Sequence, residues 1–104
     1  MVSDERMQEL VKRIVDEVHP VKVILFGSTA RGEARQDSDI DVLVVVPDGT
    51  HRRKSAQRIY RRLIGFKIPV DVVVATVSDI EKYGDSFGLV YREALKDGRE
   101  LYAA

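Results

Sequence analysis

Cysteine is absent from the 104-residue sequence, and histidine occurs only twice. A chain without cysteine has no disulfide framework, no thiolate zinc site and no cysteine nucleophile. With so few histidines, a bound metal ion would be held mainly by carboxylates. Hard cations such as Mg²⁺ prefer such oxygen ligands, so magnesium is the metal to expect.

The chain also lacks net charge and long apolar runs. Its 17 acidic and 17 basic residues cancel, which excludes a uniformly basic nucleic-acid binder. No apolar run reaches the roughly 18 residues that a membrane span needs. The N-terminal segment MVSDERMQEL is charged where a signal peptide would be apolar. We therefore expect a cytoplasmic protein without membrane contact, folded as one domain over residues 1–104.

The hydrophobic pattern predicts an α+β fold, in which helices pack on a small mixed sheet. The expected elements are helices at 4–18, 52–65 and from about 78 to 97, and strands at 21–26, 39–46, 70–75 and, at an edge, 99–103. For the last helix a break near residues 83–88, at Gly84 and Gly88, is the alternative. Ser78 and Glu81 have the spacing of a capping box, which should start the third helix.

Three aspartates occupy positions where strands are usually apolar. Asp39 and Asp41 are two residues apart, so in a strand their side chains share one face. Asp71 is flanked by apolar residues on both sides. Aspartate is depleted in strands and an unpaired buried carboxylate is costly, whereas bound divalent cations relieve both problems. The alternative is three separate structural roles, in a turn, in an ion pair and on an exposed edge.

Gly27 and Ser28 follow the first predicted strand directly. Glycine permits a close backbone approach, and free N–H groups at the start of a helix favour an anion. A phosphate could lie here, with the Ser28 hydroxyl as an additional donor. An ordinary N-cap serine after a turn glycine is the simpler alternative.

These motifs together resemble a known family. Residues 26–32 (FGSTARG) and 38–44 (SDIDVLV) are similar to the signature of the DNA polymerase β-type nucleotidyltransferases, in which Gly-Ser precedes Asp-x-Asp on the next strand. Ten residues separate Ser28 from Asp39, a spacing similar to that of the minimal nucleotidyltransferases (MNT proteins). Asp71 matches the family's third carboxylate, and the resemblance covers roughly residues 21–74.

The resemblance implies a nucleotidyltransferase-type mixed sheet that binds ATP and two magnesium ions. Asp39 and Asp41 would hold the metal ions. Asp71 would hold the catalytic metal and help to deprotonate the attacking hydroxyl. Gly27 and Ser28 would bind the β- and γ-phosphates. Arg31, in the loop before the aspartates, is a candidate phosphate ligand, although it could equally hold that loop in place.

The resemblance also implies a partner. Family members that act alone usually carry a further helical domain for the acceptor, and 104 residues leave no room for it. MNT proteins of this size are typically antitoxins of HEPN-domain RNase toxins, so we expect transfer of AMP from ATP to a toxin tyrosine. The alternatives are a non-catalytic antitoxin that inhibits by binding, and a nucleotidyltransferase acting on RNA or a small molecule. A homodimer is also reasonable.

Seven cations and no acids lie between His51 and Lys67. Because the whole chain sums to zero, the remainder carries a charge of minus seven. The simplest interpretation is a solvated helix face. A docking surface for an acidic partner, or contact with nucleotide phosphates or RNA, are the functional alternatives. The cations are Arg52, Arg53, Lys54, Arg58, Arg61, Arg62 and Lys67.

Overall fold

The computed structural model describes residues 3–27, 40–83 and 98–104, and its sheet has four strands. The strand order is β3-β2-β1-β4, formed by Val70–Thr76, Ile40–Val46, Lys22–Phe26 and Arg99–Ala103. β2 is parallel to β3, whereas β1 is antiparallel to both β2 and β4. The predicted α+β class and mixed sheet are confirmed, and the edge strand at residues 99–103 has its predicted bounds.

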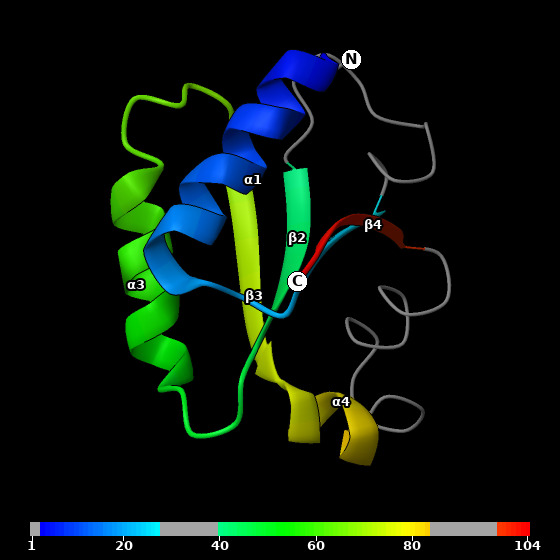
Figure 1. Ribbon diagram of the computed structural model, residues 1–104. Helices are drawn as coiled ribbons and strands as arrows, with labels where there is room; N and C mark the ends of the chain where they lie inside the picture. Colours follow the sequence, from blue (N-terminus) through cyan, green and yellow to red (C-terminus); the bar gives the residue numbers. More distant parts are fainter. Residues whose placement is uncertain (1–2, 28–39, 84–97) are drawn as a thin grey trace.

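Two long helices cover one face of the sheet. α1 (Asp4–Val18) and α3 (Arg52–Arg62) lie side by side on the same side of the strands (Figure 1). α3 is the crossover that two adjacent parallel strands, β2 and β3, require. Within the part of the chain that the structure describes, neither helix is long and apolar enough to cross a membrane.

The side chains of β2 alternate strictly between the two faces of the sheet. The even-numbered residues of β2 are fully buried against α1 and α3, together with Leu10, Ile14, Ile59 and Phe66. The odd-numbered residues Leu43 and Val45 pack on the opposite face with Ala75 and Ile80. A two-residue repeat therefore assigns Asp41 to the second face, as predicted from the sequence.

Several predicted helix ends need correction. α3 ends at Arg62, earlier than the expected residue 65. The chain cannot continue as a helix through Gly65, because this residue has a positive φ of 86°. His51 caps the N-terminus of α3, where its Nδ1 accepts a hydrogen bond from the Lys54 N–H at 3.2 Å.

The expected capping box was placed two residues too late. α4 (Val77–Tyr83) begins with Thr76 as its cap, because Thr76 and Asp79 exchange hydrogen bonds between side chain and backbone at 3.0 and 3.1 Å. Ser78, the expected cap, lies inside the helix and instead donates to the Asp48 carboxylate. The end of this helix expected near residue 97 lies outside the described residues.

Candidate active site

Three strands bring their polar residues together at one end of the sheet. In the parallel pairing, Asp41 of β2 lies opposite Asp71 of β3. In the antiparallel pairing on the other side, Asp41 lies opposite Phe26, the last residue of β1. Residues in register across a ladder share a face, so both carboxylates belong to the face that α1 and α3 leave uncovered.

Gly27 completes this arrangement from the end of β1. Its φ of 73° lies in the left-handed region that favours glycine. A Cβ atom at this position would collide with the Oδ2 atom of Asp41. The absence of a side chain is therefore what lets the backbone approach the carboxylate. Any ligand held by Asp41 would also lie beside the peptide of Gly27.

The two carboxylates differ in exposure. Asp41 is half-buried between β1 and β3, whereas Asp71 lies exposed on the edge strand. Among the described residues, Asp71 is therefore accessible from the β3 edge, whereas the neighbouring strands partly shield Asp41. A large acceptor molecule could approach Asp71 from solvent, whereas a ligand bound by Asp41 would lie close to the sheet.

The remaining predicted site residues cannot be placed relative to Asp41 and Asp71. Ser28, Arg31 and Asp39 lie outside the described residues. Within residues 3–27, 40–83 and 98–104, no three His, Asp or Glu side chains form a group able to hold a metal ion. The expected site contains three carboxylates, of which the described part contains two, Asp41 and Asp71. The metal-binding role of the three aspartates therefore stays a prediction.

Tyr60 is a residue near the site that the sequence analysis overlooked. It occupies the apolar stripe of α3, yet it is 46% exposed and its hydroxyl accepts a hydrogen bond from the Val72 N–H at 2.8 Å. Val72 directly follows Asp71, so the phenol holds the backbone of the edge strand beside the carboxylate. Tyrosine combines an apolar ring with a polar hydroxyl that usually finds a hydrogen-bond partner, and the place of Tyr60 at the rim of the stripe was the available signal.

A second pair of carboxylates lies at the opposite end of the parallel strands, where β2 and β3 finish. Hydrogen bonds from the Ser78 hydroxyl and backbone N–H lower the pKa of Asp48. The Thr76 backbone N–H is the main cause that lowers the pKa of Asp79, with a further contribution from Arg52. Both groups are engaged in starting α4, and we assign them a structural role.

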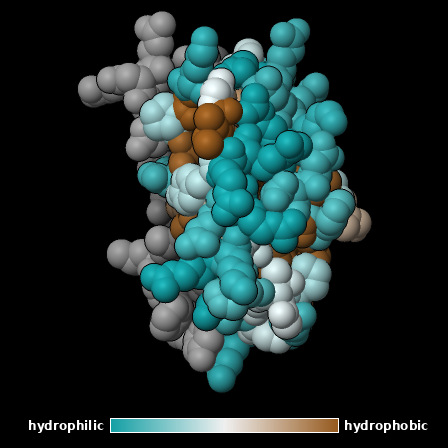
Figure 2. All heavy atoms as spheres, turned by 90° about the vertical axis from the view of Figure 1, so that its left-hand side faces the viewer, coloured by the Kyte–Doolittle hydropathy of each residue, from teal (hydrophilic) through white to brown (hydrophobic). Residues whose placement is uncertain are grey.

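The basic segment is partly neutralised within the fold. Arg58 and Arg62 of α3 contact the carboxylate of Glu17 in α1 at 3.0 and 3.6 Å, and Arg52 contacts Asp79 at 3.0 Å. The remaining cations of the segment are exposed and form no ion pair with another described residue: Arg53, Lys54, Arg61 and Lys67. Figure 2 shows this side of the molecule as a largely hydrophilic surface, interrupted by a hydrophobic patch near its upper end.

Comparison with known proteins agrees with this geometry. A family model described as "Nucleotidyltransferase domain" matches residues 7–101, which is most of the chain. The chain belongs to the nucleotidyltransferase domain family. The nucleotidyltransferase family expected from the Gly-Ser and Asp-x-Asp motifs is thereby confirmed.

Individual relatives of this nucleotidyltransferase domain match only part of the chain, at modest sequence identity. A protein of Methanocaldococcus jannaschii, named "Putative protein adenylyltransferase MJ1305", is 33% identical over 63 residues. The match covers 61% of this chain and 42% of that protein, so the chain spans less than half the length of this relative.

Solved structures of toxin–antitoxin complexes share the fold. One, a toxin–antitoxin structure with AMP-PNP, has a TM-score of 0.67 and 20% identity, and the match covers 94% of this chain and 73% of that one. Another contains a tri-AMPylated Shewanella oneidensis HEPN toxin in complex with an MNT antitoxin. It has a TM-score of 0.58 and 19% identity, with 96% and 71% of the two chains covered.

Proposed function

We propose that this nucleotidyltransferase domain transfers AMP from ATP to a hydroxyl group, most specifically a tyrosine, of a partner HEPN toxin. The observation that carries the proposal is the register of Asp41 and Asp71 across two parallel strands, with Gly27 against the Asp41 carboxylate. The AMPylated toxin in the Shewanella complex supports the acceptor class by likeness of fold.

The donor set fits magnesium. Asp41 and Asp71 share one face at the open end of the sheet, and both offer oxygen ligands of the kind that a hard cation prefers. Asp39, two residues before Asp41 in sequence, would be the third ligand. When bound, two magnesium ions would stabilise the charge that develops on the attacking and leaving oxygens of an in-line phosphoryl transfer.

The chain's own residues have distinct tasks in this proposal. The peptide of Gly27, together with Ser28, would bind the β- and γ-phosphates and orient the α-phosphate toward the carboxylates. Exposed Asp71 would accept the proton of the acceptor hydroxyl as that oxygen attacks the α-phosphorus. The bond to the β-phosphate oxygen then breaks and pyrophosphate leaves. Arg31 would contact phosphate from the loop before β2.

The test is a transfer assay with magnesium and ATP labelled in the α-phosphate. The candidate acceptors are a purified HEPN-domain toxin and total RNA, and buffer alone is the blank. We expect label on the toxin, and Asp41→Asn should lower the rate on the order of 10³-fold, because one metal ligand loses its charge.

Asp48→Asn provides a matched control for this assay. It removes a carboxylate just beyond the far end of β2, which starts α4 and takes no part in the proposed chemistry. We expect this variant to transfer label at the wild-type rate. Full activity of Asp41→Asn would contradict the proposal, and label on RNA alone would favour an RNA acceptor. Toxin inhibition without any label would favour an antitoxin that acts by binding.

A further inference from the structure

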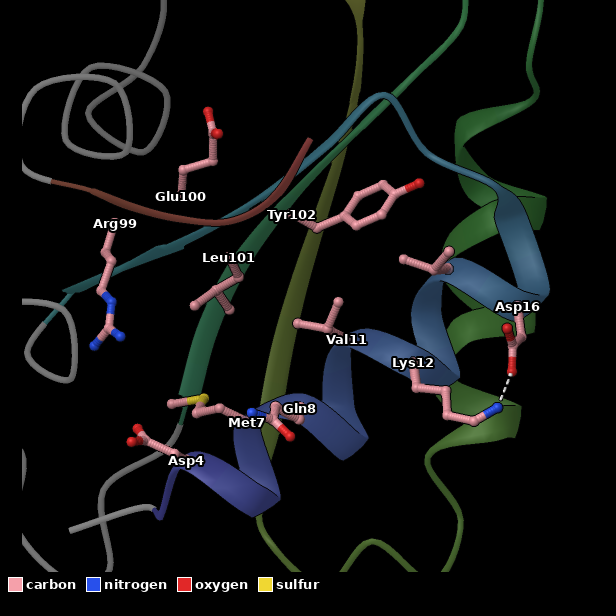
Figure 3. Close-up of a pocket in the computed structure, with 11 residues that line it drawn as sticks. Asp4, Met7, Gln8, Val11, Lys12, Asp16, Arg99, Glu100, Leu101 and Tyr102 are labelled. Atoms are coloured by element: carbon pink, nitrogen blue, oxygen red, sulfur yellow. Dashed lines mark hydrogen bonds and ion pairs between the residues drawn. The ribbon is translucent and has the colours of Figure 1, made fainter. Parts of the chain in front are cut away.

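An apolar groove lies between α1 and the edge strand β4, on the sheet face opposite the carboxylates. Its volume is about 540 Å³. Its apolar lining comes from α1 and β4, both of which leave partly exposed hydrophobic side chains there: Met7, Val11, Val15, Leu101 and Tyr102. Figure 3 shows these side chains converging between the helix and the strand.

The two edges of the sheet are treated differently. At the β3 edge, the Tyr60 hydroxyl occupies the Val72 N–H and thus blocks part of the ladder. At the β4 edge, no strand in the described part of the chain pairs with the outer side. An unpaired edge beside an apolar groove is a place where another chain can bind.

The charges around the groove indicate which chain fits it. Figure 3 shows Asp4 and Arg99 at one end, and Lys12 and Asp16 at the other. Glu100 also lines the first end and contacts Lys22 at 3.4 Å, and Lys12 contacts Asp16 of the same copy at 3.1 Å. Both ends therefore carry charges of both signs, so neither a basic nor an acidic partner is favoured as a whole. If a twofold axis relates two copies so that the first end of one groove meets the second end of the other, Asp4 of one copy lies opposite Lys12 of its partner. Arg99 then lies near the partner's Asp16. Both contacts are then attractive.

We propose that the groove is the interface of a homodimer, with α1 of a second copy packed antiparallel against α1 of the first. An isologous contact of this kind is the commonest in soluble oligomers. If Asp4 of one copy faces Lys12 of the other, Gln8, midway between them on α1, lies beside the twofold axis. The carboxylates Asp41 and Asp71 face the other side of the sheet, so both active sites stay open in the dimer.

Sedimentation equilibrium of the purified chain, without ATP, tests the interface through its charges. We expect a dimer whose dissociation constant rises about tenfold in Lys12→Glu, because two attractive contacts become repulsive. Adding Asp4→Lys to Lys12→Glu reverses both charges and should restore the dimer. Glu5→Lys, an exposed change outside the groove, should leave the constant unchanged. Circular dichroism checks that each variant is folded.

Disulfide trapping tests the position of the twofold axis. Because the chain has no cysteine of its own, only the introduced cysteine can form a disulfide. Gln8→Cys should form a covalent dimer under mild oxidation, whereas Gln57→Cys, an equally exposed position on α3, should not. Three results would overturn the proposal: a wild-type monomer at concentrations on the order of 100 µM, a dimer insensitive to Lys12→Glu, or equal trapping at both cysteines. None of them depends on AMP transfer.

Discussion

The two faces of the sheet divide stability and chemistry between them. On the face covered by α1 and α3, every side chain that β2 contributes is fully buried and aliphatic. On the other face, β2 begins with Asp41 and becomes apolar only from Leu43 onward. A single strand therefore serves both purposes, because neighbouring residues point in opposite directions. The carboxylates are confined to the strand ends, where solvent and ligands can reach them.

The substitution with the largest expected effect on this division between the two faces is Asp71→Val. We expect transfer activity to fall on the order of 10³-fold, because a proposed metal ligand and proton acceptor is lost. We expect stability to rise by up to about 1 kcal/mol, because valine suits a strand better than aspartate does. Labelled-ATP transfer and urea denaturation measure the two effects on the same preparation.

An isosteric variant separates charge from strand propensity at this position. Asp71→Asn should lose activity to a similar extent while its stability stays close to that of the wild type. Retained activity together with lower stability in either variant would make Asp71 a structural residue and remove it from the proposed site.

The opposite outcome is expected on the helix-covered face. Ile59 of α3 is fully buried against the sheet, so Ile59→Ala should lower the free energy of unfolding by about 2–5 kcal/mol. Transfer per folded molecule should stay at the wild-type value, since Asp41 and Asp71 lie on the other face of the sheet. Chemical denaturation followed by circular dichroism measures the change in stability.

Ile64 provides the matched control for the same substitution. It lies just past the end of α3 and is 76% exposed. Ile64→Ala should change stability by no more than about 0.5 kcal/mol. Equal effects at the two isoleucines would show that the packing of α3, contrary to the burial pattern, does not stabilise the sheet.

Sequence periodicity was sufficient to predict this division of the two faces. The two-residue repeat of β2 and the helical spacing of α1 placed their apolar residues correctly, since burial follows directly from period. On the third element the spacing failed at its end, where Ile64 lies past α3 and is exposed. The motif also indicated Gly27 and the aspartates. The register that sets Asp41 opposite Asp71 could not be derived, because it depends on which strands become neighbours.

Local hydrogen bonds explain what the sequence did not predict. Thr76 and Asp79 compete with Ser78 and Glu81 for the same capping role, and spacing alone does not decide between them. In the folded chain Ser78 donates to Asp48, a residue 30 positions away, a contact that spacing along the sequence does not reveal. Tyr60 was overlooked for a similar reason, because its partner Val72 is close to it only in the folded chain.

A smaller effect is expected where the phenol of Tyr60 reaches the edge strand. Tyr60→Phe removes the acceptor of the Val72 N–H and should cost about 1 kcal/mol, the usual contribution of one hydrogen bond. Amide exchange at Val72 should accelerate, while amides of β1 and β2 keep their protection. Unchanged exchange at Val72 would show that solvent replaces the phenol without loss.

The smallest expected effect concerns Asp79, which joins the second face, through α4, to Arg52 of α3. Hydrogen bonding to Thr76 keeps the pKa of Asp79 below its ordinary value in the folded state. Its stabilisation is therefore fully present above the unfolded pKa of about 4 and is lost as the pH falls through the lower folded value. Asp79→Asn should accordingly be less stable than the wild type at pH 7, and the difference should shrink as the pH is lowered toward 3. Urea denaturation at a series of pH values measures it. A difference that stays constant across that range would mean that the asparagine fails through its altered geometry at the cap, and that the charge of Asp79 contributes nothing to holding α4 on the sheet.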